Sequence, residues 1–195
     1  MRATELNEYI HVHYDSASKK VTVENITCSD PFFADLDAEV KISFNNCIFE
    51  KEFCFTGAPD QSEIIFNRCM LNGELQIYGS KASITYKILF SQIKNGFSID
   101  DSENISLFMG QSQGNGEFRF DNTKFNSCSF AGFSFNELTH EDSASFRNCV
   151  FKSSNFRDTV LSNPSFNNSI FITDATFDRS VLNHIHGPGS GNFFN

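Results

Sequence analysis

Large apolar residues recur at every fifth position in the C-terminal half of the chain. A small residue lies two positions before most of them, as at Ala144, Cys149 and Ser154. The grid pauses after its fourth member, resumes eleven residues later, and slips by one residue near its end. We expect its large members to form the structural core: Phe120, Phe125, Phe130, Phe135, Phe146, Phe151, Phe156, Leu161, Phe166, Phe171, Phe177 and Leu182.

A five-residue period fits neither an α-helix nor a flat strand. Five steps turn a helix by about 500°, so the large residues would lie on every face. Strand alternation has a period of two, which an odd spacing breaks. The period instead predicts a coil that turns a corner every five residues, with one large and one small inward side chain on each side. Four sides make a coil of about 20 residues.

A looser repeat runs through the N-terminal half. One set of apolar pairs recurs at spacings of 22, 22 and 21 residues: Phe53 and Phe55, Leu75 and Ile77, Phe97 and Ile99, Phe118 and Phe120. A second set recurs at spacings of 22, 20 and 21 residues: Ile42 and Phe44, Ile64 and Phe66, Ile84 and Tyr86, Ile105 and Leu107. Glycines at 73, 96 and 116 precede the first set, where we expect corners that need backbone freedom. Two sets with one period predict stacked coils.

These patterns predict an all-β fold, a parallel β-helix of about eight coils from near Val21 to Leu182. Residues 1–20 are expected to form an N-terminal cap, because the terminal coils of a solenoid need covering. Irregular coils are expected over 21–117 and regular coils over 118–182, continuous with each other in one domain. We expect residues 183–195 to form a C-terminal tail or cap.

The regular units carry a resemblance to a known family. From Ala144 they read ASFRN, CVFKS, SNFRD, TVLSN, PSFNN and SIFIT, and past Asp174 they read ATFDR and SVLNH. They resemble the pentapeptide-repeat family, whose loose motif is a small residue, a variable residue that is often Asp or Asn, Leu or Phe, and two polar residues. The resemblance covers residues 118–182. It implies a right-handed β-helix with four-sided coils, a quadrilateral solenoid.

Composition and charge limit the classes of partner that the protein is expected to bind. The chain has 24 Phe, 4 Tyr and no Trp, which fits one apolar filler at many equivalent positions. Its formal net charge is −9, so we expect no direct binding of nucleic acid, whose phosphates need a basic surface. The start shows no secretory signal and no segment reads as a membrane span, so no membrane partner is expected. Six cysteines without an export signal predict reduced thiols in the cytoplasm.

The cysteines form two pairs at the coil spacing. Cys47 and Cys69 are 22 residues apart, and Cys128 and Cys149 are 21 apart, so each pair is expected to stack one coil apart. A disulfide or a bound metal is one interpretation. The other is a small buried residue in a core ladder, which we expect because a packed interior leaves no room for an ion.

Two His-x-His pairs lie near the chain ends. On a strand, His11 and His13 would share one face, as would His184 and His186, and such a pair can start a metal site. No third ligand lies at a readable distance from either pair. We therefore predict solvated end positions, with no metal site and no cofactor.

Two further features could carry function. Asp100, Asp101 and Glu103 could supply the paired carboxylates of glycoside chemistry, or they could be turn residues at a corner. The grid advances by 11 positions from Phe135 to Phe146, where an advance of 10 would keep the five-residue register. Residues 136–143 are therefore expected to bulge. Candidate partner contacts in this loop are Leu138, His140, Glu141 and Asp142, and segments 110–116 and 56–62 are loop candidates of the same kind.

Two functions remain open on this evidence. The regular rod without a catalytic motif predicts a non-catalytic scaffold that presents a rigid surface or loop to an unidentified protein partner. The family resemblance implies an alternative, an acidic rod that mimics duplex DNA and binds DNA gyrase or another topoisomerase, as quinolone-resistance proteins do. The net charge suits that role, but residues 118–182 are close to neutral, with seven acidic and six basic side chains. An exposed terminal coil would leave an open sheet edge, through which two copies could pair end to end.

Overall fold

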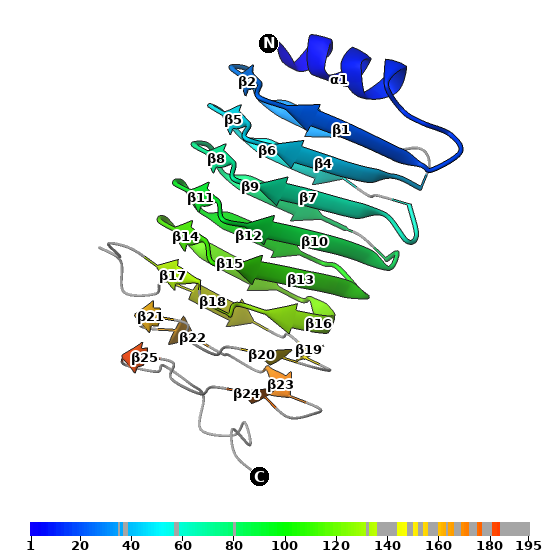
Figure 1. The fold of residues 1–195 in the computed structure, drawn as a ribbon. Coiled ribbons are helices and arrows are strands. Elements are labelled where there is room, and N and C mark those ends of the chain that lie inside the picture. The colour runs from blue at the N-terminus through cyan, green and yellow to red at the C-terminus, as the bar shows by residue number, and fades with distance from the viewer. Residues whose placement is uncertain are drawn as a thin grey trace.

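The computed structural model shows a parallel β-solenoid with one short helix at its N-terminal end (Figure 1). All pairs between its named strands are parallel, so the predicted fold class is confirmed. From Ser134 on, side chains are described only for Phe146 and Ser169. The structure describes residues 1–34, 36, 39–56, 59–79, 81–131, 133–135, 144–147, 150–151, 154–155, 160–162, 164–165, 169–171, 175–176 and 181–183.

Helix α1 (Ala3–Val12) lies over the first coil, an element that the sequence analysis did not predict. It contacts β1 (Lys20–Glu24) and β3 (Phe32–Ala34), and it buries Leu6 completely. The carboxylate of Glu5 accepts a hydrogen bond from the backbone N–H of Arg2 at 2.8 Å, which stabilises the first turn. The helix thus covers the terminal coil with one apolar face.

The first five coils each contain three strands, one in each of three sheets. Sheet A holds β1, β4 (Lys41–Asn45), β7 (Glu63–Asn67), β10 (Ile84–Leu89) and β13 (Ile105–Gly110). Sheet B holds β2 (Thr27–Cys28), β5 (Ile48–Phe49), β8 (Met70–Leu71), β11 (Gln92–Ile93) and β14 (Gln113–Gly114). Sheet C holds β3, β6 (Phe53–Thr56), β9 (Leu75–Tyr78), β12 (Phe97–Asp100) and β15 (Phe118–Asp121).

Shorter strands continue the same three sheets toward the C-terminus. They are β16 (Lys124–Ser129), β17 (Ser134–Phe135), β18 (Ala144–Arg147), β19 (Val150–Phe151), β20 (Ser154–Asn155), β21 (Val160–Ser162), β22 (Pro164–Ser165), β23 (Ile170–Phe171), β24 (Ala175–Thr176) and β25 (Val181–Asn183). Between β19 and β22 a coil has four short strands, as the quadrilateral pattern requires. The expected count of about eight coils is therefore corrected to five regular three-strand coils followed by coils of another form.

Strand β16 is where the coil changes form. In β13 the buried residues alternate strictly, at Ile105, Leu107 and Met109, whereas in β16 they lie three apart, at Phe125 and Cys128. The register between the two strands shifts by one residue after Ile105. On its other side β16 pairs with both β19 and β20. One extra residue thus divides a long side into two short ones.

The stacking of the N-terminal coils follows one predicted set of pairs and departs from the other. Phe53 lies over Leu75 and Leu75 over Phe97, as the first set predicted. In the second set Ile64 pairs with Tyr86, so the predicted alignment of Ile64 with Ile84 is wrong by two residues. Both β10 and β13 have three inward positions, and a shift of two residues keeps every side chain on its own face. The apolar pattern alone therefore allows either register.

Phenylalanine rings fill the interior from coil to coil. Phe44 stacks on Phe66 at 5.2 Å between ring centroids, and Phe120 stacks on Phe146 at 4.8 Å. Of the predicted core residues, those with described side chains are all buried: Phe120, Phe125, Phe130 and Phe146. The structure does not describe the side chains of the other predicted core residues: Phe135, Phe151, Phe156, Leu161, Phe166, Phe171, Phe177 and Leu182.

Candidate interaction surfaces

The paired cysteines belong to a ladder at one corner of the solenoid. Cys47, Cys69, Ser91 and Ser112 are buried in successive coils, each directly after a residue of positive φ. The thiol of Cys69 donates to the backbone oxygen of Phe44 at 3.2 Å, and the hydroxyl of Ser112 donates to that of Ile88 at 3.1 Å. These hydrogen bonds satisfy the buried thiol and hydroxyl groups and tie each corner to the preceding coil. The ladder is structural.

The stacked thiols of Cys47 and Cys69 shift each other's pKa in opposite directions. Their hydrogen bond and the burial of Cys69 raise the pKa of the Cys69 thiol, so it keeps its proton at neutral pH, whereas the same hydrogen bond lowers the pKa of the Cys47 thiol to about 7. The five described cysteines are all buried: Cys28, Cys47, Cys54, Cys69 and Cys128. Within the described part of the chain, no three His, Cys, Asp or Glu side chains come together as a metal-binding group.

The second predicted cysteine pair is not in register. Cys128 pairs with Ser154, not with position 149, because the coil between β15 and β18 is longer than the others. Phe118 and Ala144 are partners 26 residues apart, whereas partners in the preceding coils are 20–22 apart. The grid gap after Phe135 is therefore larger than the one residue that the sequence suggested.

The extra residues of this coil fall between β17 and β18, in the segment that was predicted to bulge. That segment, with Leu138, His140, Glu141 and Asp142, lies outside the described residues. The second loop candidate, 110–116, is corrected, since it contains strand β14 of sheet B. The third, 56–62, begins at the end of β6 and is described only in part.

The first histidine pair lies at the C-terminal end of helix α1 and not on a strand, which corrects the expected shared face. His11 is in the last turn of α1, and His13 follows the helix. The His13 ring stacks on Tyr9 at 3.9 Å, and its Nδ1 lies 2.9 Å from the backbone oxygen of Tyr9. His184 and His186 lie outside the described residues.

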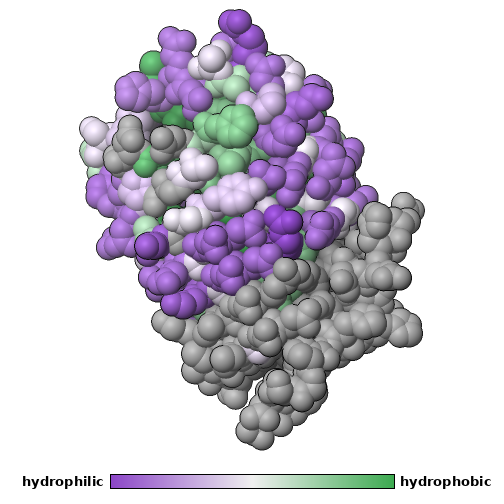
Figure 2. All heavy atoms as spheres, turned by 180° about the vertical axis from the view of Figure 1, so that it is seen from behind, coloured by the Kyte–Doolittle hydropathy of each residue, from purple (hydrophilic) through white to green (hydrophobic). Residues whose placement is uncertain are grey.

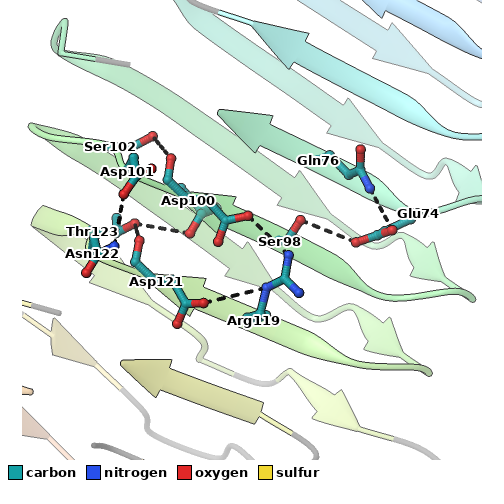
Figure 3. A network of polar contacts seen from close by, with 11 residues as sticks. Glu74, Gln76, Ser98, Asp100, Asp101, Ser102, Arg119, Asp121, Asn122 and Thr123 are labelled. Atoms are coloured by element: carbon teal, nitrogen blue, oxygen red, sulfur yellow. Dashed lines mark hydrogen bonds and ion pairs between the residues drawn. The ribbon is translucent and has the colours of Figure 1, made fainter. Parts of the chain in front are cut away.

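The outer face of sheet C carries a connected polar network (Figure 3). Ser98 on β12 donates to Glu74 at 3.3 Å, and Gln76 on β9 donates to the other oxygen of the same carboxylate at 2.7 Å. On the neighbouring strand β15, Arg119 donates to Asp100 at 3.2 Å and lies 3.7 Å from Asp121. Three successive coils thus hold this network in place.

The Arg119 guanidinium offsets part of the negative charge of the network. Burial raises the pKa of Asp100 above its ordinary value of 3.8, and the hydrogen bond and positive charge of Arg119 offset part of that rise. In turn, the hydrogen bond to Asp100 raises the pKa of Arg119. The Arg119 side chain remains 39% exposed. The face therefore presents a fixed guanidinium between two carboxylates.

The acidic cluster at the end of β12 does not act as one unit. Asp101 has a positive φ of 50° and accepts a hydrogen bond from the Asn122 amide at 2.9 Å, so it is a corner residue. Glu103 pairs with Lys124 at 2.9 Å. Asp100 accepts a hydrogen bond from Arg119. Each of the three carboxylates thus contacts a different residue of the next coil. This arrangement favours the turn interpretation over paired carboxylates for glycoside chemistry.

Ion pairs also shape the acidic surface as a whole. Glu63 lies between Lys41 and Lys87, and Glu39 pairs with Lys19. With the pairs of Asp100, Glu103 and Asp121, basic residues interrupt the carboxylates in most of the described coils. A duplex mimic needs a run of free negative charges along the rod. The observed pairing does not favour the DNA-mimic alternative.

A groove of about 590 Å³ lies between α1 and the first coil. Ile10 and Tyr14 line it from the helix side, and Phe33, Leu36 and Val40 line it from the coil side. Phe33 points outward from sheet C and is 63% exposed. Figure 2 shows hydrophobic surface gathered near the helix end of this face, with hydrophilic surface around it.

Sequence reasoning missed both of these surfaces. The signal for the groove was the pair Phe32 and Phe33, because alternation puts one of two adjacent residues on the outer face of a strand. The signal for the network was Arg119, which lies between the inward residues Phe118 and Phe120 and therefore faces outward. It occupies the same coil position as Ser98.

Comparisons with known proteins bear on the C-terminal part of the chain. Residues 141–181 match the family model of pentapeptide repeats, described as nine copies. No curated protein matches the chain. Within the described residues, no helix is both long and apolar enough to cross a membrane.

Proposed function

Since residues 141–181 are pentapeptide repeats that continue a parallel β-solenoid, we propose that this solenoid is a non-catalytic scaffold that binds a protein partner through the outer face of sheet C. The observation that carries the proposal is the polar network of that face. Arg119, Asp100 and Asp121 come from two adjacent coils and hold one another in a fixed arrangement.

A fixed network lowers the cost of binding. Long side chains normally lose conformational freedom when a partner orders them, about 0.5–1.5 kcal/mol for each one. Here the solenoid has already ordered the guanidinium of Arg119 between two carboxylates. Arginine is also among the residues that most often dominate protein interfaces. The partner would present an acidic or amide side chain to Arg119 and donors to the carboxylates.

The proposal includes the cytoplasm as its location and excludes membrane and nucleic acid as direct partners. Buried cysteines and the net charge of −9 support these parts. End-to-end pairing of two copies would involve the C-terminal end of the stack, because α1 covers the first coil.

The experiment is affinity capture of the full chain from its native host, followed by a binding titration with the captured protein. We expect wild type and the Lys94→Ala control, an exposed charge beyond β11, to bind alike. We expect Arg119→Ala to bind at least about tenfold more weakly, with its thermal melting compared to wild type to check folding. Equal binding of Arg119→Ala and wild type would exclude this face.

Two further assays address the alternatives. Turnover of a carbohydrate substrate that disappears in Asp100→Asn or Asp101→Asn would show an enzyme and contradict the scaffold. Slowing of gyrase supercoiling by the purified chain would support the DNA mimic. We expect neither effect.

A further inference from the structure

The groove beneath α1 borders one edge of β3, with which no other described strand pairs. Strand β3 ends sheet C and pairs only with β6 among the described strands. The backbone N–H of Phe32 donates to Glu52 at 2.9 Å, so Phe32 faces β6. Because backbone groups alternate along a parallel strand, the N–H and C=O of Phe33 face the opposite way, toward the groove. This edge can pair with one more strand.

Apolar side chains lie on both sides of that edge. The Phe33 ring is 63% exposed on the outer face, and Leu36 and Val40 continue the apolar wall beyond β3. Ile10 and Tyr14 face them from α1 and the turn that follows it. A strand placed here would direct alternate side chains toward these walls. The volume of about 590 Å³ lies within the range of binding clefts.

The charge around the groove indicates which residues would lie at the ends of such a strand. Residues 1–40 contain eight acidic and three basic side chains, which accounts for most of the net charge of the chain. Glu8 lies on the groove wall, and Lys19 is already paired with Glu39. The region of the chain that forms the groove is therefore acidic in composition, with Glu8 on the wall, and it favours a basic occupant.

We propose that the groove binds a short extended segment of a partner protein, with apolar side chains at alternate positions and Lys or Arg at its ends. The segment pairs with the free edge of β3 and places its apolar side chains against Phe33 and α1. Main-chain hydrogen bonds supply affinity and the apolar walls supply specificity, as in other cases of strand addition. The inference rests on the proposed function only in taking the occupant to be a protein.

A labelled peptide tests this directly with the full chain. The probe is a fluorescent nine-residue peptide, Lys-Lys-Val-Thr-Val-Thr-Val-Lys-Lys, and the measurement is its fluorescence anisotropy. We expect saturable binding, weakened at least about tenfold by Phe33→Ser. Phe90→Ser is the matched control, because Phe90 is an exposed ring on another corner, and it should leave binding unchanged. Both variants remove a solvent-exposed ring and leave the core intact.

Two altered probes separate the sources of affinity. A peptide N-methylated at the central valine loses a backbone donor and should bind at least about tenfold more weakly. A peptide with Glu in place of its four Lys residues should also bind at least about tenfold more weakly. If the N-methylated peptide binds as tightly as the parent peptide, strand addition is contradicted. If the Glu peptide binds as tightly as the parent, selection by charge is contradicted.

Other outcomes would overturn the proposal. They are the absence of binding up to about 1 mM peptide, or equal binding to wild type and Phe33→Ser. A dimer in sedimentation that dissociates in Phe33→Ser would show that a second copy fills the groove. The captured partner could bind Phe33→Ser as tightly as wild type but no longer bind Arg119→Ala. That result would exclude the groove as a binding site and leave the scaffold proposal intact.

Discussion

The coils from β1 to β15 and those from β16 onward enclose the same kind of apolar core. They differ in the strands that form the sheet A side of each coil. In the first region sheet A contributes one straight strand of five or six residues per coil. In the second region two short strands, β19 and β20, take the place of that strand, and both pair with β16. Partner residues remain 20–22 apart in most coils of both regions. A single extra residue in β16 is enough to change one form into the other.

Both regions satisfy their corners in the same way. In the first region buried Cys or Ser side chains after the sheet A strands β4, β7, β10 and β13 donate to the backbone of the preceding coil. In the second region Ser169, at the small position of a pentapeptide unit, donates to the backbone oxygen of Phe146 at 3.0 Å. Thr123, two residues before Phe125, does the same to Ile99 at 3.1 Å. Where the small residue of the repeat is Ser or Thr, it can thus donate a hydrogen bond to the preceding coil as well as fit the narrow inward position.

The largest expected effect comes from the ring that joins the two regions. Phe120 stacks on Phe146 and contacts Phe97 at 5.5 Å between centroids, so Phe120→Ala opens a cavity across the junction. We expect the free energy of unfolding to fall by about 3–5 kcal/mol in urea titrations. Phe90→Ala, at a ring 57% exposed, should change it by less than about 0.5 kcal/mol. A small effect of Phe120→Ala would mean that the regions do not share a core.

A corner glycine of the first region should come next. Gly116 has a φ of +85°, and a Cβ there would lie 2.6 Å from the backbone nitrogen of Gly96. We expect Gly116→Ala to cost about 2–3 kcal/mol in the same titration. Gly110→Ala is the control, because its Cβ would meet only the Leu89 side chain at 3.4 Å. Equal losses in the two variants would show that the corner imposes no special backbone demand.

The corner ladder allows a finer test. Ser91 donates to Leu89 at 2.8 Å and accepts from the backbone N–H of Cys69 at 3.0 Å. Ser91→Ala should lower the free energy of unfolding by about 1–2 kcal/mol, because these backbone groups are buried. Ser91→Cys should lose less, since Cys47 and Cys69 occupy the same position in earlier coils. If both variants lose the same, the donor does not matter.

The smallest effect is a dependence on pH. Burial opposes ionisation of Glu63, but its contacts with Lys41 and Lys87 outweigh that effect and lower its pKa below the ordinary 4.5. The ion pairs therefore stabilise the fold above that value, and the contribution is lost as pH falls through the lower folded pKa. We expect Glu63→Gln to cost roughly 1 kcal/mol at pH 7 and almost nothing in strong acid. A cost independent of pH would contradict the assignment.

The sequence predicted the fold class because its period has a direct geometric meaning. Phe125 and Phe130 mark two sides of a coil, and both are buried. The register at Ile64 could not be predicted, since three inward positions on β10 permit a shift of two residues without moving any side chain to the other face. Helix α1 was missed because ten residues carry only a short apolar pattern. The network around Arg119 depends on which outward residues become neighbours, which the inward pattern does not determine.

Cross-linking of outward residues on β7 and β10 tests the stacking of the coils most directly. Ile65 and Lys87 are partners on these adjacent strands, whereas the apolar spacing alone would place Ile65 beside Thr85. A reagent that bridges thiols about 5 Å apart should link Ile65→Cys with Lys87→Cys, with the unmodified chain as the control for its buried native thiols. It should leave Ile65→Cys with Thr85→Cys largely unlinked. Preferential linkage of the second pair, or of neither, would contradict this solenoid.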